Sequence, residues 1–487
     1  MNVAIIGAGF GGIGLAIALR RAGYDDLTIF ERSGGVGGTW RANTYPGAAC
    51  DIPSHLYSFS FEPYAGWSRA YASQAEILAY LALCVDKYDL RRHLRLNAEV
   101  AAARFDETSA RWEVRLASGE SHAYTILVSA CGQLNRPAYP HVAGRETFAG
   151  PQFHSSRWRH DVALAGKRVA VIGTGASAIQ FVPEIARQVR QLDLYQRTPP
   201  YVIPRADVPY PRWLRGAFAV FPGLQRLSRT LQYVTHEARA LGFTRLTWAM
   251  EMPRRGALRH MRRMVGNAEL RAKLVPDYPI GCKRILVSND YYPALARDNV
   301  TLVTEEIARI TPRGVVTTGG LERPAAVLIY GTGFHATEFL VPMKVTGANG
   351  VDLHERWRDG AQAYLGISVA GFPNFFLLYG PNTNLGHNSI VYMLESQIRY
   401  VMSCIDALAH GARSLDVRAD VQSAFNARLQ RRMRQTIWSQ GCSSWYQTAG
   451  GKHTNNWPSF TFAYRRATRR IALEDYDVAP TAREASR

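Results

Sequence analysis

Residues 3–12, Val3-Ala4-Ile5-Ile6-Gly7-Ala8-Gly9-Phe10-Gly11-Gly12, join a β-branched apolar run to a glycine-rich turn. A helical pattern follows the turn, so the stretch predicts a strand, a tight turn and a helix. Gly7, Gly9 and Gly12 occupy the three glycine positions of a GxGxxG sequence. Glycines there allow the turn and let backbone N–H groups approach a pyrophosphate at the helix N-terminus. The stretch therefore predicts a dinucleotide-binding unit.

A second turn of the same kind begins at Gly173, after the apolar run 169–172, and continues through Gly175 and Ser177 to Ala178. The two turns differ in the residue that follows each at the same interval. Glu31 lies 24 residues after Gly7, and Arg197 lies 24 residues after Gly173. A carboxylate accepts hydrogen bonds from a free ribose 2′-hydroxyl, whereas a guanidinium suits a 2′-phosphate. The sequence therefore predicts FAD at the first turn and NADPH at the second, and a flavin-dependent redox enzyme.

The expected fold class is α/β, with two doubly wound Rossmann-like domains and a helical insertion. A chain of 487 residues, 47% hydrophobic and 20% charged, is long enough for two or three globular domains. The first unit is expected to hold strand 2–6, helix 10–22, strand 26–30, helix 73–88, an antiparallel excursion at 100–117 and strand 125–129. The second unit opens near residue 167, is interrupted at about 204–280, and ends near 333. A strand at 375–381 and a helix at 389–410 are expected to return to the first unit.

These patterns divide the chain into three segments. We expect residues 1–145 to be the first part of the FAD-binding domain. Residues 146–345 are expected to form the NADPH-binding domain with its insertion, and residues 346–487 the second part of the FAD-binding domain with a C-terminal loop. The polar stretch from Glu474 is expected to be a disordered tail.

Cysteine usage excludes some redox classes. The six cysteines form no C-x-x-C pair and no close spacing. We therefore expect free thiols, no structural disulfide and no metal site. A disulfide reductase, which would use the same two cofactors, is disfavoured because no dithiol lies near either turn.

The net charge of +19 comes mainly from arginine, much of it between Arg205 and Arg284. We favour a solvated helix face that attracts an anionic cofactor over nucleic-acid binding, because leucine, methionine and tryptophan interrupt the basic residues. The segment 211–275 suits either a membrane surface or a cover over a substrate cavity, and we prefer the cover. No apolar run reaches the roughly 20 residues that span a bilayer, and a strand begins close to Met1. These features predict a cytoplasmic protein without stable membrane insertion, and they leave its oligomeric state open.

Two longer strings carry a family resemblance. Residues 37–51, Gly-Gly-Thr-Trp-Arg-Ala-Asn-Thr-Tyr-Pro-Gly-Ala-Ala-Cys-Asp, and residues 148–158, Phe-Ala-Gly-Pro-Gln-Phe-His-Ser-Ser-Arg-Trp, resemble the signatures GGxWxxxxYPGxxxD and FxGxxxHxxxW. These are the signatures of type I Baeyer–Villiger monooxygenases, within the flavin-containing monooxygenase superfamily. The resemblance covers nearly the whole chain, with the two nucleotide turns in the family's order.

Shorter segments extend the resemblance. Lys283-Arg284 is similar to the family's active-site arginine segment, and Arg197-Thr198-Pro199 to its NADPH phosphate clamp. Residues 380–387 resemble a flavin-side loop. Trp445, followed by Gly451-Lys452 and Trp457-Pro458, resembles a C-terminal loop that folds over NADP in some members.

The resemblance implies that NADPH reduces FAD, that O2 adds to give a C4a-peroxyflavin, and that a ketone becomes an ester or lactone. An always-charged Arg284 would stabilise the anions, and Asp51 would orient it. Without the resemblance, Arg284 reads as a surface phosphate binder and Asp51 as a helix cap. For His154 we expect cofactor or domain positioning. The expected cofactor-binding residues are Gly7, Gly9, Gly12, Glu31, Gly38, Thr39, Trp40, Asp51, Gly173, Gly175, Ser177, Arg197, Thr198, Lys283, His154, Asn384, His387 and Trp445.

Some positions depart from the family pattern. Arg159 stands where the second signature usually ends in proline or aspartate, whereas Trp158 agrees with the Baeyer–Villiger side. Three alternatives remain open: N- or S-oxygenation by the neutral hydroperoxide, an NADPH-dependent flavin reductase or oxidase, and a basic scaffold for membrane or nucleic acid. The expected partners are O2 and an apolar ketone. We expect pocket residues in the insertion at about 204–280 and in the loop at 430–460, and the apolar substrate is inferred from side chains such as Trp213, Phe218, Phe221, Trp248 and Met250.

Overall fold

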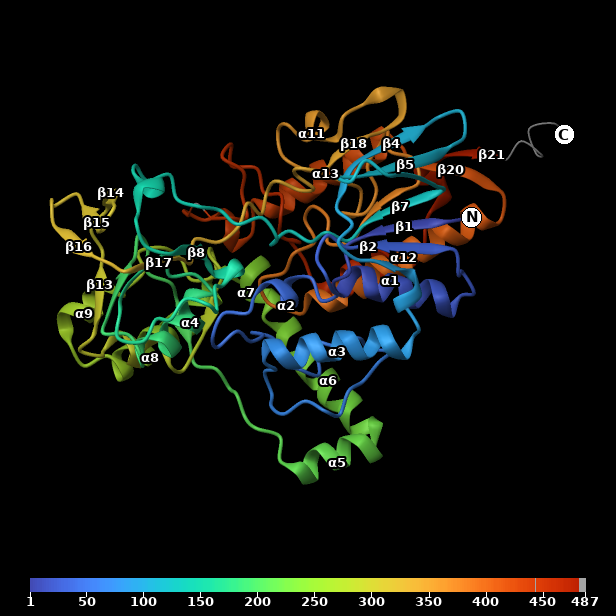
Figure 1. Cartoon of the computed structure of the whole chain (residues 1–487). Helices are drawn as coiled ribbons and strands as arrows, with labels where there is room; N and C mark the ends of the chain where they lie inside the picture. Colours follow the sequence, from blue (N-terminus) through green and yellow to red (C-terminus); the bar gives the residue numbers. More distant parts are fainter. Residues whose placement is uncertain (443, 481–487) are drawn as a thin grey trace.

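The protein is described by a computed structural model that covers residues 1–442 and 444–480. Two five-stranded parallel sheets organise the chain (Figure 1). The first has the strand order β19-β7-β1-β2-β3 and the second β13-β10-β9-β17-β8. In each sheet the strand before the glycine turn lies in the middle, and the chain winds outward from it in both directions. This arrangement confirms the α/β expectation of two doubly wound units.

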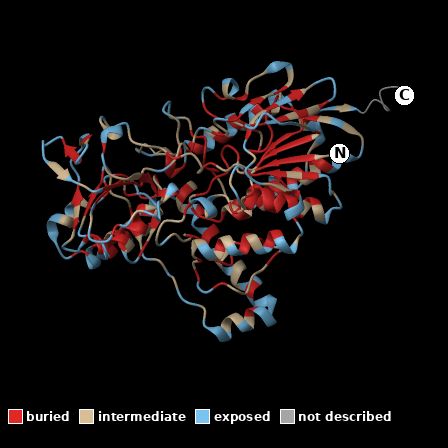
Figure 2. Ribbon diagram, viewed as in Figure 1, coloured by how far each residue is buried: buried red, intermediate tan, exposed pale blue. Residues whose placement is uncertain are grey.

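The first unit is a three-layer structure around its parallel sheet, whose strands are largely buried (Figure 2). Val3 and Ile5 pack against the helices on one face, while Ala4 and Ile6 pack on the other against a mixed sheet of order β18-β4-β5-β6, in which only β18 runs parallel to its neighbour. The alternation follows from the two-residue period of a strand, and it explains why the strand is apolar on both faces. The strands are β1 (Val3–Ile6), β2 (Leu27–Phe30), β3 (Leu94–Arg95), β4 (Val100–Asp106), β5 (Arg111–Leu116), β6 (Ser121–Tyr124), β7 (Ile126–Ser129), β18 (Lys344–Thr346) and β19 (Phe375–Leu377), and the main helices are α1 (Phe10–Arg21), α3 (Gln74–Lys87) and α12 (Ile390–Ala409).

The second unit repeats the pattern around β9. Apolar side chains of α4, α8 and α10 cover one face of its sheet, and a three-stranded antiparallel sheet lies against the other. The elements are β8 (Gln152–His154), β9 (Arg168–Ile172), α4 (Ala178–Ala186), β10 (Gln191–Tyr195), α8 (Glu251–Met264), α10 (Tyr291–Leu295), β13 (Val300–Val303), β14 (Ile307–Thr311), β15 (Gly314–Thr317), β16 (Glu322–Pro324) and β17 (Val327–Tyr330). A short parallel pair, β11 (Val202–Ile203) and β12 (Leu286–Val287), closes the base of the insertion.

The insertion is helical, as expected. It contains α5 (Arg212–Val220), α6 (Pro222–Ala238), α7 (Ala240–Thr244), α8 and α9 (Ala268–Lys273). Helices α5 and α6 project from the body of the molecule (Figure 1). One face of α6 binds the first unit: Gln225 Nε2 donates to Tyr64 O at 2.7 Å, and Arg229 Nη1 donates to His55 O at 2.7 Å and Ser58 O at 2.8 Å. The insertion therefore ties the second unit back to the first.

The expectation of a disordered tail from Glu474 is wrong for the residues described. Strand β21 (Tyr476–Pro480) pairs antiparallel with β20 (Ala412–Val417). Tyr476 is buried, and its hydroxyl lies 2.8 Å from Ser368 Oγ and 3.0 Å from Tyr400 Oη. One buried aromatic with two polar partners is enough to fix a polar segment. Residues 481–487 lie outside the described residues.

Candidate active site

Both glycine turns leave the carboxyl end of the central strand of their sheet. At Gly7, φ is +105°, and an added Cβ would lie 2.7 Å from Ala130 O. At Gly173, φ is +104°, and a Cβ would lie 2.4 Å from Gly331 O. Both positions therefore require glycine. They place two equivalent turns where ligands bind in open parallel sheets.

The first turn is a cradle lined by backbone. A Cβ on Gly12 would lie 1.9 Å from Gly7 O, so helix α1 packs directly on the turn. A Cβ on Gly9 would lie 3.7 Å from Gly38 Cα, and a Cβ on Gly38 would lie 3.1 Å from Gly9 Cα, so the two glycines approach each other closely. Helix α2 (Thr39–Ala42) begins immediately after Gly38. The start of α2 thus lies beside the turn that opens α1, and the N–H groups at the starts of the two helices are those that a pyrophosphate needs.

Glu31 is held against this turn. It follows β2, is buried, and accepts at Oε2 from the Ala8 N–H at 2.9 Å. Its Oε1 accepts from the Ser33 N–H at 2.9 Å and from Ser33 Oγ at 2.8 Å. A carboxylate has about four acceptor sites, so one remains for a ribose hydroxyl.

The second turn lies near two cations. Gly175 is open, since a Cβ there would meet only Gly331 O at 3.8 Å, and Ser177 precedes α4. Arg197 follows the end of β10 and is exposed, and Thr198 O accepts from Thr174 Oγ1 at 3.3 Å. Lys283 Nζ lies 4.7 Å from the centre of the Tyr278 ring, and burial and the nearby Arg197 lower the pKa of Lys283. Two close positive charges at the end of β10 suit a 2′-phosphate.

Arg284 and Asp51, 233 residues apart in sequence, form an ion pair between the two units. Asp51 Oδ2 accepts from Arg284 Nε at 3.0 Å and from Nη2 at 2.5 Å. Both side chains are about a quarter exposed, at 27% and 28%. The Asp51 carboxylate raises the pKa of Arg284 above its usual value, so the guanidinium stays charged throughout the physiological range.

The segment before Asp51 is docked on helix α4. Gln180 Oε1 accepts from Tyr45 Oη at 3.0 Å and from the Ala49 N–H at 3.4 Å, and Gln180 Nε2 donates to Ala49 O at 3.0 Å. Gly47 has φ +78°, and a Cβ there would lie 2.7 Å from Gln180 O. The Tyr-Pro-Gly-x-x-x-Asp part of the first signature thus carries Asp51 from the first unit to the second. Sequence reasoning missed Gln180, because nothing in the turn that precedes it marks a contact with residues 45–49.

The second signature contributes buried residues and a contact with helix α4, as expected of residues that position the two units. His154 is fully buried at the end of β8, and its Nδ1 accepts from the Ser156 N–H at 3.2 Å. Burial lowers the pKa of His154 to about 4, so the ring is neutral at pH 7. Trp158 and Tyr45 both pack on the ring of Phe181 in α4, with ring centres 5.3 and 5.9 Å away. The two signatures therefore meet on one helix.

Asn384 joins the flavin-side loop to the C-terminal loop. Its Oδ1 accepts from Tyr379 Oη at 2.7 Å, and its Nδ2 donates to Asn456 Oδ1 at 2.7 Å. Trp445 O accepts from Asn455 Nδ2 at 2.9 Å, and the Trp445 ring lies 4.4 Å from that of Tyr446.

Two phenols, the buried Tyr446 and the half-buried Tyr379, lie in the electrostatic environment of Arg284. Burial raises the pKa of Tyr446 to about 12 and raises that of Tyr379 as well, although Arg284 opposes both shifts. Both phenols are therefore protonated at pH 7. Sequence reasoning named neither of them, because a tyrosine in an aromatic-rich segment is usually a packing residue.

His387 lies in a different environment. Its side chain is fully buried near Phe243 of α7, with ring centres 6.0 Å apart, and Nε2 is 3.8 Å from Glu237 Oε2. Burial, together with His236 and Arg239, lowers the pKa of His387 to about 3. The neutral ring packs where the flavin-side loop meets the insertion.

The expectation of six free thiols is wrong. Cys282 and Cys442 form a disulfide with a Cα–Cα distance of 6.3 Å, whereas Cys50, Cys84, Cys131 and Cys404 are free. The bridge joins the residue before Lys283-Arg284 to the loop that leads to Trp445. A separation of 160 residues leaves no spacing pattern, so sequence alone could not pair these cysteines.

The apolar side chains expected to line a substrate pocket divide into two groups. Trp213, Phe221 and Trp248 are exposed on the outer surface of the insertion, which is a correction to that expectation. Phe218 is buried beside His55, with ring centres 4.7 Å apart, and Met250 belongs to a buried aromatic cluster with Cys282.

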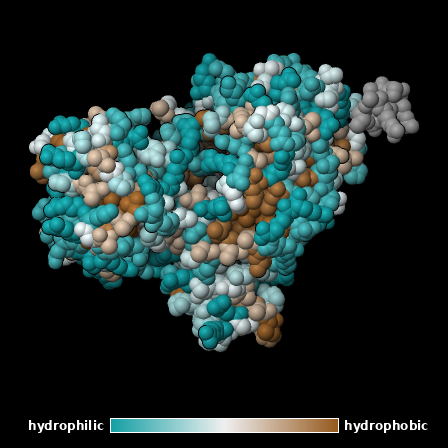
Figure 3. Space-filling view, viewed as in Figure 1, coloured by the Kyte–Doolittle hydropathy of each residue, from teal (hydrophilic) through white to brown (hydrophobic). Residues whose placement is uncertain are grey.

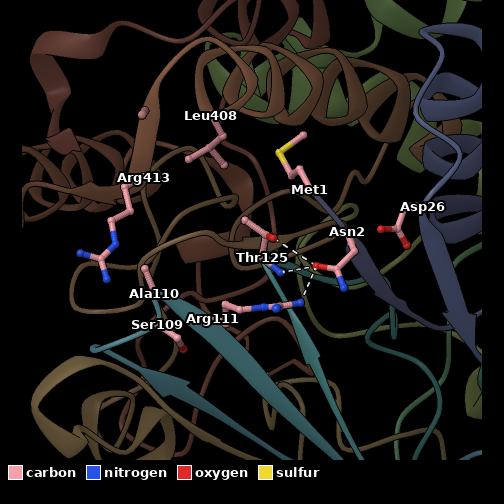
Figure 4. Close-up of a pocket in the computed structure, with 10 residues that line it drawn as sticks. Met1, Asn2, Asp26, Ser109, Ala110, Arg111, Thr125, Leu408 and Arg413 are labelled. Carbon is pink, nitrogen blue, oxygen red and sulfur yellow. Dashed lines mark hydrogen bonds between the residues drawn. The ribbon is translucent and has the colours of Figure 1, made fainter. Parts of the chain in front are cut away.

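Two further features are remote from this chemistry. A surface pocket beside Met1 lies at the amino ends of β1 and β7 (Figure 4), the opposite end of the sheet from the glycine turn. There Asn2 Oδ1 accepts from the Thr125 N–H at 2.9 Å and from Arg111 Nη2 at 3.2 Å, which anchors the chain terminus. Within residues 1–442 and 444–480, no group of three or more metal-ligating side chains is present, and no helix is long and apolar enough to cross a membrane.

Comparisons with known proteins agree with the site. Residues 1–222 match the family model "Flavin-binding monooxygenase-like". A Baeyer–Villiger monooxygenase of Pseudomonas aeruginosa is 48% identical over 99% of this chain and 92% of its own length. The chain belongs to the Baeyer–Villiger monooxygenases. Another member, from Streptomyces coelicolor, is 44% identical over 98% of the chain and 92% of its own length.

Solved structures of such enzymes have the same fold over the full length. An oxidised steroid monooxygenase bound to NADP superposes with a TM-score of 0.88 at 32% identity, covering 98% of this chain and 99% of that one. A closed cyclohexanone monooxygenase gives 0.89 at 26% identity, covering 99% of each chain. The family expectation from the two signatures is therefore confirmed.

Proposed function

We propose that this Baeyer–Villiger monooxygenase uses NADPH and O2 to insert one oxygen atom beside a ketone carbonyl. Ketone, O2, NADPH and a proton become an ester or lactone, NADP⁺ and water. FAD fits the first turn, where Glu31 leaves an acceptor for a ribose hydroxyl, and NADPH fits the second, beside Arg197 and Lys283. The related steroid monooxygenase is bound to NADP, and the structure named OTEMO is in complex with FAD and NADP.

The observation that carries the proposal is the Arg284–Asp51 pair. Oxygen insertion into a ketone places negative charge on the carbonyl oxygen, and a fixed cation stabilises that charge more in the transition state than in the ground state. Two hydrogen bonds to Asp51 hold the guanidinium of Arg284 in one orientation. Among the described residues no other hydrogen-bond acceptor binds the Arg284 guanidinium, and we infer that its remaining N–H groups bind the substrate oxygen.

The neighbouring groups set the conditions for this step. When bound, FAD supplies the reactive oxygen chemistry, and NADPH supplies the two electrons. The carboxylate of Asp51 balances part of the charge of Arg284 and fixes the direction of its guanidinium. Tyr446 and Tyr379 keep their protons near the guanidinium, and the Tyr379 hydroxyl donates to Asn384 Oδ1.

We infer an apolar ketone from the side chains near Arg284. A Cβ on Gly281 would lie 3.0 Å from Met250 Cε and 3.1 Å from the Phe243 ring, so apolar groups reach within three residues of Arg284. The same cluster contains Trp438 and Tyr446. An apolar surround excludes water and strengthens the field of the cation.

Substitution of Arg284 tests the proposal. We expect Arg284→Ala to lower ester formation by about 100- to 1,000-fold, as the loss of one oxyanion donor does elsewhere, with the flavin still reduced by NADPH. Arg284→Lys keeps the positive charge but loses the planar guanidinium with its paired N–H donors, and this variant is expected to retain part of the activity. Arg313→Ala, at an exposed arginine that pairs with Glu322, is the matched control. Undiminished ester formation in Arg284→Ala would overturn the proposal, and a wild type that oxygenates sulfides or amines but no ketone would favour heteroatom oxygenation.

A further inference from the structure

Large apolar side chains are exposed along the helical insertion far more than elsewhere. About half of all those exposed in the described chain lie between residues 213 and 252. Soluble monomeric proteins rarely expose a group of large apolar side chains unless that patch binds a partner. They are Trp213, Val220, Phe221, Leu224, Leu227, Leu231, Val234, Leu241, Leu246, Trp248 and Met252.

Helix α6 presents an apolar face away from the protein. Leu224, Leu227, Leu231 and Val234 follow a spacing of three and four residues and are 45%, 56%, 58% and 56% exposed. The opposite face of α6 holds Gln225 and Arg229, which bind the first unit. The apolar face is therefore turned outward. Figure 3 shows hydrophobic surface at the tip of the projection, where α5 meets α6, next to hydrophilic surface.

The charges around this face have one sign. Residues 211–246 contain six arginines and a single acid, Glu237. Glu237 is buried, and its carboxylate accepts from Asn388 Nδ2 at 2.7 Å and Thr461 Oγ1 at 2.7 Å. Arg212, Arg226, Arg239 and Arg245 are exposed on this segment. As far as residue 246, the outer surface of the segment thus combines leucine, tryptophan and arginine with no exposed carboxylate. The exposed Glu251, just beyond it, forms ion pairs with Arg254 and Arg255.

We propose that residues 211–252, the α5–α7 arm, bind the surface of a lipid bilayer that contains anionic headgroups. The leucine face of α6 enters the level of the headgroups, Trp213 and Trp248 lie at the boundary, and the exposed arginines meet lipid phosphates. The positive charge of the arm favours an anionic lipid surface over a second copy of the chain as its binding partner. Two arms whose exposed charges are mainly those of arginine repel each other, and each chain has a net charge of +19. No part of the chain needs to cross the bilayer.

Flotation of the FAD-loaded enzyme with lipid vesicles tests this proposal. One set of vesicles contains phosphatidylglycerol and phosphatidylcholine, and the other contains phosphatidylcholine alone. The arm variant combines Leu227→Asp with Leu231→Asp. The control combines Leu321→Asp with Leu473→Asp, two leucines that are similarly exposed outside the arm.

We expect the wild type and the control to float with the anionic vesicles, much less with the neutral ones, and less as salt is raised. The affinity of the arm variant for anionic vesicles should fall by at least about tenfold for each leucine replaced. Its flavin content and the reduction of its flavin by NADPH should be unchanged. The proposal is wrong if the wild type stays in the aqueous fraction with both vesicles, or if the control loses binding as the arm variant does. It is also wrong if the wild type is a dimer in solution that the arm variant dissociates, since the face would then bind a second copy.

Discussion

Replacing Gln180 by leucine tests whether the first signature places Asp51 by docking on the second unit. Leucine fills a similar volume, so the helix and its packing are retained. The change removes the two 3.0 Å hydrogen bonds, from Tyr45 Oη and to Ala49 O, and the longer one from the Ala49 N–H. At about 1 kcal/mol net for each short bond, docking weakens by about 2 kcal/mol, or roughly 30-fold.

The weaker docking should appear as uncoupling of NADPH consumption from ester formation. With segment 45–51 undocked for part of the time, Asp51 no longer holds Arg284, and NADPH is consumed without ester being formed. We expect the ester formed per NADPH to fall and H2O2 to rise, while the anaerobic reduction of the flavin by NADPH changes by less than about twofold. Gln188→Leu, at an exposed glutamine just after α4, is the matched control. Full coupling in Gln180→Leu would refute the view that this contact positions Asp51.

Three further predictions concern the second turn, acid stability and the thiols. Arg197→Ala and Lys283→Ala should each raise the KM for NADPH and leave the KM for NADH nearly unchanged. Steady-state kinetics with both cofactors measures the two constants. An equal rise in KM for NADPH and NADH would contradict a role at the 2′-phosphate. Burial lowers the pKa of His154 to about 4, below its unfolded value near 6.5, so its contribution to stability is complete above about pH 6.5 and is lost as the pH falls towards 4. The thermal midpoint should therefore fall less steeply over that range in His154→Asn than in the wild type, and parallel curves would exclude the effect. Thiol titration of the unfolded, unreduced protein should find four free thiols, with Cys282 and Cys442 appearing only after reduction, whereas six thiols without reduction would contradict the bridge.

Much of this architecture was predictable because local rules determine it. The turns at Gly7 and Gly173 combine apolar strands, glycine conformations and helix starts that a short stretch of sequence specifies. The charges of Glu31 and Arg197 distinguish the two cofactor units for the same reason. The pairing of Arg284 with Asp51 came from the family resemblance, since no local pattern joins residues 233 apart.

The remaining features depend on tertiary packing. Gln180 lies on a helix that reads as ordinary, and only the docked loop shows what it binds. The Cys282–Cys442 bridge and the strand at Tyr476 depend on partners far away in sequence. The apolar side chains of the insertion were assigned to a cavity because sequence gives the composition of a helix and its periodicity, but not which of its faces meets the protein.

Oxygen insertion is the central claim, and the flavin spectrum tests it without knowledge of the ketone. The purified enzyme is reduced with NADPH without oxygen, mixed rapidly with O2, and followed by absorbance. We expect a transient spectrum that differs from both reduced and oxidised flavin, and that decays faster when an apolar ketone is added. Direct return to oxidised flavin with one H2O2 released per NADPH would contradict an oxygenase and indicate an oxidase or reductase.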